Sequence, residues 1–218
     1  MTIARYLRLL RESPEGVFNP WRDFDAANDR SPNAPVWRSE NLEAYLADRI
    51  GRARWLLLAE AAGFRGAKFS GITMTCERQL PDMNVPHPRT SRDDVPLSAA
   101  DRKQGVLEPT ATIVRRALGH AGVDPIDVIL CNTFAWHPHK PGQPLTNRTP
   151  TPAEVQSGRR ALAALFELAG DVPRIAIGRT AERMLIETLA LDAPTVRHPA
   201  NGGAVEFTKG IVRLLKGS

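Results

Sequence analysis

The stretch from residue 55 to residue 71, WLLLAEAAGFRGAKFSG, constrains the fold more than any other part of the chain. It begins with five consecutive apolar residues, a run short enough for a strand that is buried on both faces. A glycine-rich turn follows, carrying one acidic residue, Glu60, and two aromatic residues, Phe64 and Phe69. In open α/β sheets, ligands bind where buried parallel strands end in loops of this kind. We therefore expect this stretch to form a central parallel strand and one wall of a functional site.

Three later segments repeat this design, and two of them end in a polar residue. They are residues 127–132 (DVILCN), 174–178 (RIAIG) and 195–198 (TVRH). Because the carboxyl ends of parallel strands meet at one edge of a sheet, Glu60, Asn132 and His198 are expected to converge there.

Helical patterns separate these strands. They are expected at residues 2–12, from Ser39 to about 50, 109–121, 151–169, about 180–190, and after residue 203. Residues 13–38 and 81–105, which are rich in helix breakers, are expected to form irregular loops. The order predicts an α/β fold, a three-layer α/β/α sandwich with a four-stranded parallel sheet. We expect one domain over residues 1–218, with residues 1–38 forming an N-terminal helix and arm packed on it.

Composition excludes several classes of protein. The chain has 218 residues, two cysteines outside any CxxC motif, and a formal net charge of +5. No apolar run approaches a membrane span, the N-terminus does not resemble a signal peptide, and a disulfide scaffold is excluded. A cytoplasmic location is the expectation, and the basic charge favours nucleic acid or another polyanion as partner.

Each of the three converging residues has a structural and a functional interpretation. Glu60 is either satisfied by the N–H groups of the turn or acts as a general base. Asn132 is either a turn former or reads the edge of a planar ligand with its amide. His198 either makes a hydrogen bond at a strand end or donates to an oxyanion. The HPANGG pattern that it begins favours donation to an oxyanion.

The WHPHKPG segment holds two histidines that could bind a metal or a phosphate. No carboxylate or cysteine lies at a matching spacing, so neither a metal nor any other cofactor is expected. No phosphate-binding or dinucleotide-binding glycine motif is present either. The favoured interpretation is a surface that contacts phosphates, formed by His137, His139, Lys140, Arg148, Arg65 and Lys68.

Three motifs together resemble the uracil-DNA glycosylase superfamily. They are AEAAGFRG at residues 59–66, CNTFAWHPH at 131–139 and HPANGG at 198–203. The resemblance extends over roughly residues 50–215 and concerns a bacterial branch whose first motif contains Glu.

The resemblance implies a role for each matching position. Glu60 would be the catalytic carboxylate, and His198 would donate to O2 of the departing base. Asn132 would bind the N3–H and O4 edge of uracil, and Phe69 would stack on the flipped base. Further base contacts would come from Ala61, Gly63 and Phe64, and further DNA contacts from Asn201 and Gly202. The implied partner is DNA containing uracil, single- or double-stranded, with free uracil as product and the protein acting as a monomer.

The sequence also departs from the pattern of that superfamily. Ala59 and Ala62 replace the usual Gly and Pro, and Ala61 stands where the best-known branch has Asp. Two cysteines are too few for the iron–sulfur cluster of a related branch. Two other functions therefore stay open: a uracil- or damaged-DNA binding protein with weak or no turnover, and a hydrolase of free nucleosides or nucleotides.

Overall fold

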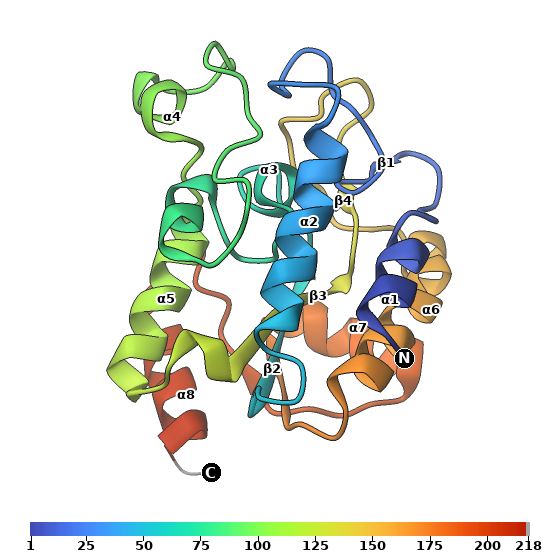
Figure 1. Ribbon diagram of the computed structural model, residues 1–218. Coiled ribbons are helices and arrows are strands. Elements are labelled where there is room, and N and C mark those ends of the chain that lie inside the picture. Colours follow the sequence, from blue (N-terminus) through green and yellow to red (C-terminus); the bar gives the residue numbers. More distant parts are fainter. Residues whose placement is uncertain (217–218) are drawn as a thin grey trace.

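The computed structural model describes residues 1–216 and contains the expected four-stranded parallel sheet. The strand order is β3-β2-β5-β6, with all three neighbouring pairs parallel. The strands are β2 (Trp55–Ala61), β3 (Val128–Phe134), β5 (Arg174–Ile177) and β6 (Thr195–Val196). Figure 1 shows β2 and β3 in the lower half of the view, with helices on either side of them.

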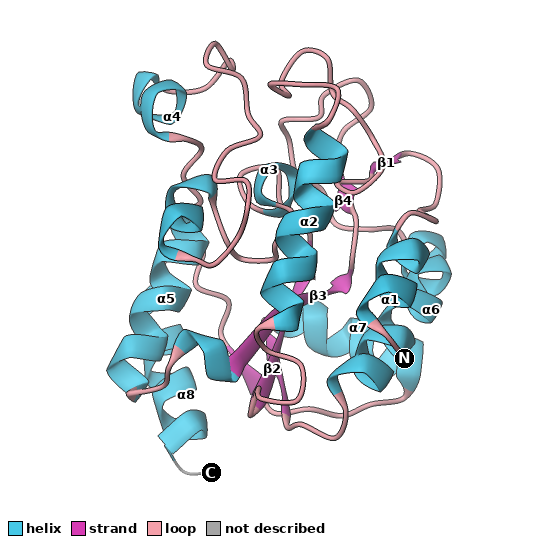
Figure 2. Ribbon diagram, viewed as in Figure 1, coloured by secondary structure: helices cyan, strands magenta, loops and turns pink. Residues whose placement is uncertain are grey.

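Helices cover both faces of the sheet, which confirms the three-layer prediction. One face packs against α1 (Ile3–Leu10), α2 (Ala34–Ala47), α6 (Pro152–Ala169) and α7 (Arg179–Leu189). The other face packs against α5 (Pro109–Ala121) and α8 (Ala204–Lys216). The helices lie on both sides of the strands in Figure 2.

The apolar run in β2 supplies both cores because alternate side chains of a strand point to opposite faces. Leu56 and Leu58 join the core with α1, α2, α6 and α7. Trp55, Leu57 and Ala59 join the core with α5 and α8. The three leucines are completely buried, as expected for the central strand of a covered parallel sheet.

Two strands are longer than the sequence predicted. β2 continues to Ala61 and β3 to Phe134, because Ala61 pairs with Phe134 in the ladder. Asn132 is likewise paired, opposite Ala59. Glu60, predicted to follow its strand, and Asn132, predicted to end its strand, therefore both lie inside regular strands, each of which continues two residues beyond its predicted end.

The second helix begins at Ala34, and the prediction that Ser39 opens it was wrong. Pro35 lies in the first turn, where its missing N–H breaks no helical hydrogen bond and its fixed φ suits the helix. Other helix ends match the sequence signals. The Thr151 and Glu154 capping box starts α6, and Gly122 ends α5 in the left-handed conformation.

The 81–105 segment is more ordered than its composition suggested. It is bordered by a 3₁₀ helix, η1 (Glu77–Asp82), and holds a short helix, α4 (Ala99–Gln104). The buried Glu77 carboxylate organises it by accepting from the backbone N–H groups of Thr90 (2.7 Å), Ser91 (2.8 Å) and Val106 (2.9 Å).

The remaining elements are short. β1 (Val17–Phe18) pairs antiparallel with β4 (His137–Pro138), which ties the N-terminal arm to the WHPHKPG segment. α3 (Ala67–Ser70) follows the glycine-rich turn, and a second 3₁₀ helix, η2 (Pro125–Asp127), precedes β3.

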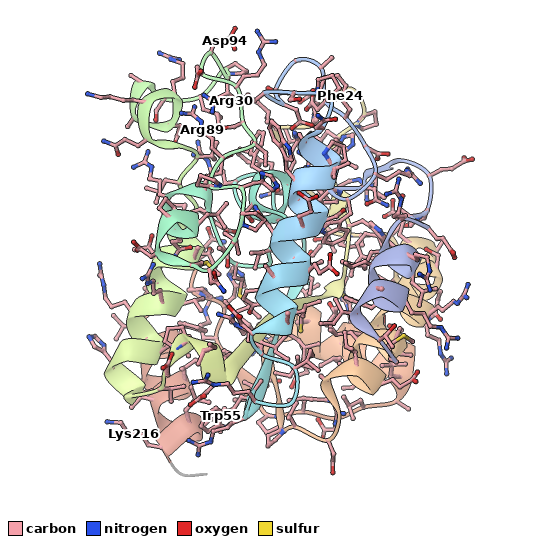
Figure 3. All side chains as sticks on the ribbon, in the orientation of Figure 1. Phe24, Arg30, Trp55, Arg89, Asp94 and Lys216 are labelled. Carbon is pink, nitrogen blue, oxygen red and sulfur yellow. The ribbon has the colours of Figure 1, made fainter. Side chains whose placement is uncertain are left out.

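The long loops gather at the carboxyl ends of the strands. In Figure 3, Trp55, the first residue of β2, lies low in the view, whereas Arg30 and Arg89 lie at the upper end. Arg30, in the N-terminal arm, pairs with Asp93 at 2.7 Å and so links the arm to the 81–105 segment. Arg89 pairs with the same Asp93 at 3.2 Å within that segment. The loop-rich end is where this class of fold binds its ligands.

Candidate active site

Glu60, Asn132 and His198 line one pocket of about 380 Å³ at the carboxyl edge of the sheet. They come from β2, β3 and the loop after β6, so residues distant in sequence share one cavity. The expected convergence is therefore present in the structure. Ala61 and Gly63 line the same pocket.

Glu60 is the sixth residue of the seven-residue strand β2 and is half-buried. Its carboxylate makes no hydrogen bond or ion pair with any residue in the described range 1–216. The backbone is fixed by the sheet, and the Glu60 carbonyl accepts from the Thr133 hydroxyl at 2.8 Å. An acidic group is thus held on a rigid element while its oxygens stay available to a ligand.

His198 is oriented as a neutral hydrogen-bond donor. Its Nδ1 accepts the backbone N–H of Ala200 at 3.1 Å, which places the proton of the neutral ring on Nε2. Burial, together with the neighbouring Arg197, lowers the pKa of His198. Near neutral pH the imidazole therefore offers one N–H to the pocket.

The HPANGG loop is shaped closely around His198. A Cβ atom at Gly203 would lie 2.1 Å from the His198 carbonyl oxygen, so only glycine fits there. Asn201 and Gly202 adopt left-handed conformations, with φ of +53° and +77°. Both are exposed at the surface beside the pocket, in a position to meet a large ligand.

The Asn132 amide is buried and already bonded to the protein. With its oxygen facing the available donors, it accepts from Ala62 N at 3.1 Å and Thr73 Oγ1 at 3.0 Å, and its nitrogen donates to Ala61 O at 3.3 Å. One N–H of the amide is left for a ligand. Asn132 thus presents a donor, suited to a carbonyl oxygen of a base.

Phe69 does not lie where the resemblance implied. Its ring is completely buried and packs with Val95 and Val106, and it is not part of the pocket lining. Met74, with φ of +48°, lines the pocket instead. Phe64 is half-buried outside the lining, and its backbone N–H donates to Asn147 Oδ1 at 3.0 Å.

Two residues expected to contact phosphate are buried in the protein, so those predictions were wrong. Lys68 is completely buried, with Nζ 2.9 Å from Asp25 Oδ2, and burial lowers its pKa. His137 is also completely buried, with its ring nitrogens 2.8 Å from Ala62 O and 3.0 Å from Pro144 O. Both side chains hold loops together. In a single sequence, a basic residue with this structural role looks the same as one that binds phosphate.

The other predicted basic contacts are nearer the surface. Lys140 is exposed, and His139 and Arg65 are half-buried, Arg65 being paired with Asp101 at 3.1 Å. Arg148 lines the pocket while both its terminal nitrogens bind Glu154, at 2.6 and 2.8 Å.

Sequence reasoning missed a second hollow, of about 740 Å³, which Glu60 and His198 also border. Exposed Arg179 and Arg197 line it, beside the N-terminus of α7. The sequence contained an indication of this hollow, because Arg179 lies just after the end of a strand, as His198 does. Two exposed basic side chains next to the pocket form a positively charged border that favours an anionic ligand.

Sequence reasoning also missed Glu108, a second carboxyl group in the pocket lining. Burial raises its pKa to about 7. Its place directly before the proline that opens α5 resembles an ordinary helix cap. Within the described residues, no group of three or more His, Cys, Asp or Glu side chains is arranged to hold a metal ion.

The comparisons with known proteins concern the fold. No protein-family model matches the chain, and no curated protein matches it by sequence. Among solved structures, SMUG2 of Pedobacter heparinus superposes with a TM-score of 0.64 over 100% of this chain and 97% of that one. The fold is uracil-DNA glycosylase-like. Because the two sequences are only 12% identical, the similarity to SMUG2 establishes only the fold. The chemistry has to be inferred from the residues of the pocket. No helix within residues 1–216 is both long and apolar enough to cross a membrane.

Proposed function

We propose that this protein is a DNA glycosylase that removes uracil from DNA by hydrolysing the N-glycosidic bond and leaves an abasic site. The observation that carries the proposal is the shared pocket of Glu60, Asn132 and His198 in a uracil-DNA glycosylase-like fold. The pocket volume, about 380 Å³, is large enough for one nucleobase and too small for a duplex. The target nucleotide therefore leaves the base stack before it reacts.

The chemistry follows from where charge develops. Breaking the bond between the sugar and the base builds positive charge on the sugar and negative charge on the base. Glu60 stabilises the sugar cation and positions the water that attacks it. His198 donates from Nε2 to the O2 oxygen of uracil, and the free Asn132 N–H donates to a carbonyl of the base.

DNA is the proposed partner because basic side chains flank the pocket. Arg179 and Arg197 lie in the adjoining hollow, and Arg148 lines the pocket itself. The net charge of +5 attracts the phosphate backbone as a whole. We expect the protein to act as a monomer in the cytoplasm, with free uracil as product and no cofactor.

Incubation with an end-labelled oligonucleotide that contains one uracil tests the proposal. Treatment with alkali after the reaction should break the strand at the uracil position, and free uracil should appear in equal amount. A gel shift without base release would instead favour a DNA-binding protein without turnover. Cleavage of deoxyuridine but not of DNA would favour a nucleoside hydrolase.

A further inference from the structure

The pocket holds a carboxyl group that the proposed function leaves unused. Glu108 lines the same cavity as Glu60, Asn132 and His198. Its Oε2 atom is buried and has no hydrogen-bond partner among the residues that the structure describes. A buried polar atom without a partner destabilises the fold, so one that borders a pocket marks a group that a ligand can satisfy.

The local structure does not use this carboxyl group. Glu108 is the N-cap residue of α5, where a carboxylate usually accepts from the first free N–H groups of the helix. Its side chain makes no such bond. It is turned toward the glycine-rich turn instead, and a Cβ atom at Gly66 would lie 2.5 Å from Glu108 Oε2. The turn thus contains glycine where the Glu108 carboxyl needs the space.

The surroundings keep Glu108 protonated to higher pH than an ordinary glutamate. Removal from water raises the pKa of Glu108 to about 7. The nearby arginines are paired with other carboxylates, Arg65 with Asp101 and Arg148 with Glu154. The titratable and charged groups that face this region come from five segments of the chain: Glu60, Arg65, Cys76, Arg148 and His198.

We propose that Glu108 is a second catalytic residue of this pocket, donating its carboxyl proton to the departing base. This inference rests on the proposed glycosylase function. Two carboxyl groups in one site can divide the acid and base roles between them. The sequence resemblance assigned only one carboxylate, and Glu108 lies outside its motifs.

The bond between C1′ and the base nitrogen breaks, and its electron pair stays on the base. The Glu108 proton moves to a carbonyl oxygen of the base. Water adds its oxygen to C1′ and gives a proton to the Glu60 carboxylate. Exchange with solvent then returns a proton to Glu108 and removes one from Glu60.

The dependence of single-turnover uracil release on pH tests this role, measured from pH 5 to pH 9 on a single-stranded oligonucleotide. The parent rate should fall about tenfold for each pH unit above about 7, as Glu108 loses its proton. Glu108→Gln should be about 100-fold slower at pH 6 and should lack this fall. Glu206→Gln, at an exposed position of α8 that does not line the pocket, also removes a carboxylate and should follow the parent.

A second variant separates proton donation from a structural role. Glu108→Ala should be slow, and added formate should restore at least about tenfold of its rate below pH 7, because a small carboxylic acid can occupy the space left free. Glu108→Gln with the parent's pH profile, or Glu108→Ala without rescue, would overturn the inference. A parent protein that releases no uracil at any pH would contradict the proposed function itself.

Discussion

A hydrogen bond at Gly178 helps to hold the loop that carries His198 close to the strand that carries Glu60. Gly178, with φ of +88°, ends β5 between them, and a Cβ atom there would lie 3.1 Å from His198 Cβ. The Gly178 N–H donates to the Val196 carbonyl at 2.8 Å, which fixes the approach of the His198 loop to the sheet. The pocket geometry therefore depends on residues without functional side chains.

Glu60→Gln should reduce uracil release by about 10³-fold, because a neutral amide stabilises the sugar cation poorly and cannot take a proton from water. Single-turnover rates at saturating protein give the chemical step. The melting temperature should stay within a few degrees of the parent, since Glu60 makes no side-chain bond within residues 1–216. An active Glu60→Gln variant would remove this residue from the mechanism.

Glu108→Gln should change the pH dependence of stability. The folded state keeps the Glu108 proton up to a pKa of about 7, whereas the unfolded chain loses it near 4.5. The stability contributed by this group is thus complete below about 4.5 and lost as the pH rises through about 7. The variant, which has no such loss, should gain about 1–3 kcal/mol over the parent between pH 4 and pH 8 in urea unfolding. A constant difference across that range would show that the pKa of Glu108 is the same in the folded and unfolded states.

At the scale of elements, the sequence predicted the positions of helices and strands well. It predicted less well which side chains around the site are buried. Apolar runs, caps and glycine stops are local signals, so β2, α5 and α6 could be located from them. The burial of Lys68 and His137 depends on the N-terminal arm and the 138–147 loop packing over them, and no local pattern shows this packing. Glu108 was missed for the same reason, because its partner surface is a turn more than 40 residues away.

Leu57→Ala should destabilise the protein by about 2–5 kcal/mol, because Leu57 is completely buried between β2, α5 and α8. Chemical unfolding measures the change. Val205→Ala, at a position that is 58% exposed, is the matched control and should change stability by less than about 0.5 kcal/mol. Equal effects of the two substitutions would contradict the assignment of β2 as the central strand.

Glu77→Ala should loosen the 81–105 segment more than the rest of the molecule. The carboxylate satisfies the backbone N–H groups of Thr90, Ser91 and Val106, which would be left buried without acceptors. Hydrogen exchange should become at least about tenfold faster over residues 88–107 while β2 and β3 stay protected. Unchanged exchange in that segment would show that the ion pairs of Arg30 and Arg89 suffice to hold it.

At the scale of the whole molecule, the pocket lies at the carboxyl edge of the sheet, and the second hollow, lined by Arg179 and Arg197, lies beside it. Glu60 and His198 border both the pocket and the second hollow. A DNA strand that contacts Arg179 and Arg197 would therefore pass directly beside the pocket. A net charge of +5 alone would give only weak, diffuse attraction. The arrangement directs that attraction to the loop-rich end of the fold.

Replacing both Arg179 and Arg197 by Ala should weaken binding to single-stranded DNA equally for all sequences. Loss of two phosphate contacts should reduce the slope of log K against log salt by about 1.4. Fluorescence anisotropy at salt concentrations from about 50 to about 300 mM measures the slope. Replacing Arg5 and Arg8, exposed on α1, should leave the slope unchanged.

The N-terminal arm has a practical consequence for anyone who shortens this protein. Trp21 Nε1 donates to the Gly71 carbonyl at 3.2 Å, and Asp25 neutralises Lys68 directly behind the glycine-rich turn. Removal of residues 1–38 would therefore leave Lys68 buried without its acidic partner. It would also remove the contact of Trp21 that supports the glycine-rich turn beside the pocket. A minimal fragment made in this way would lose the geometry of the pocket before it lost the sheet.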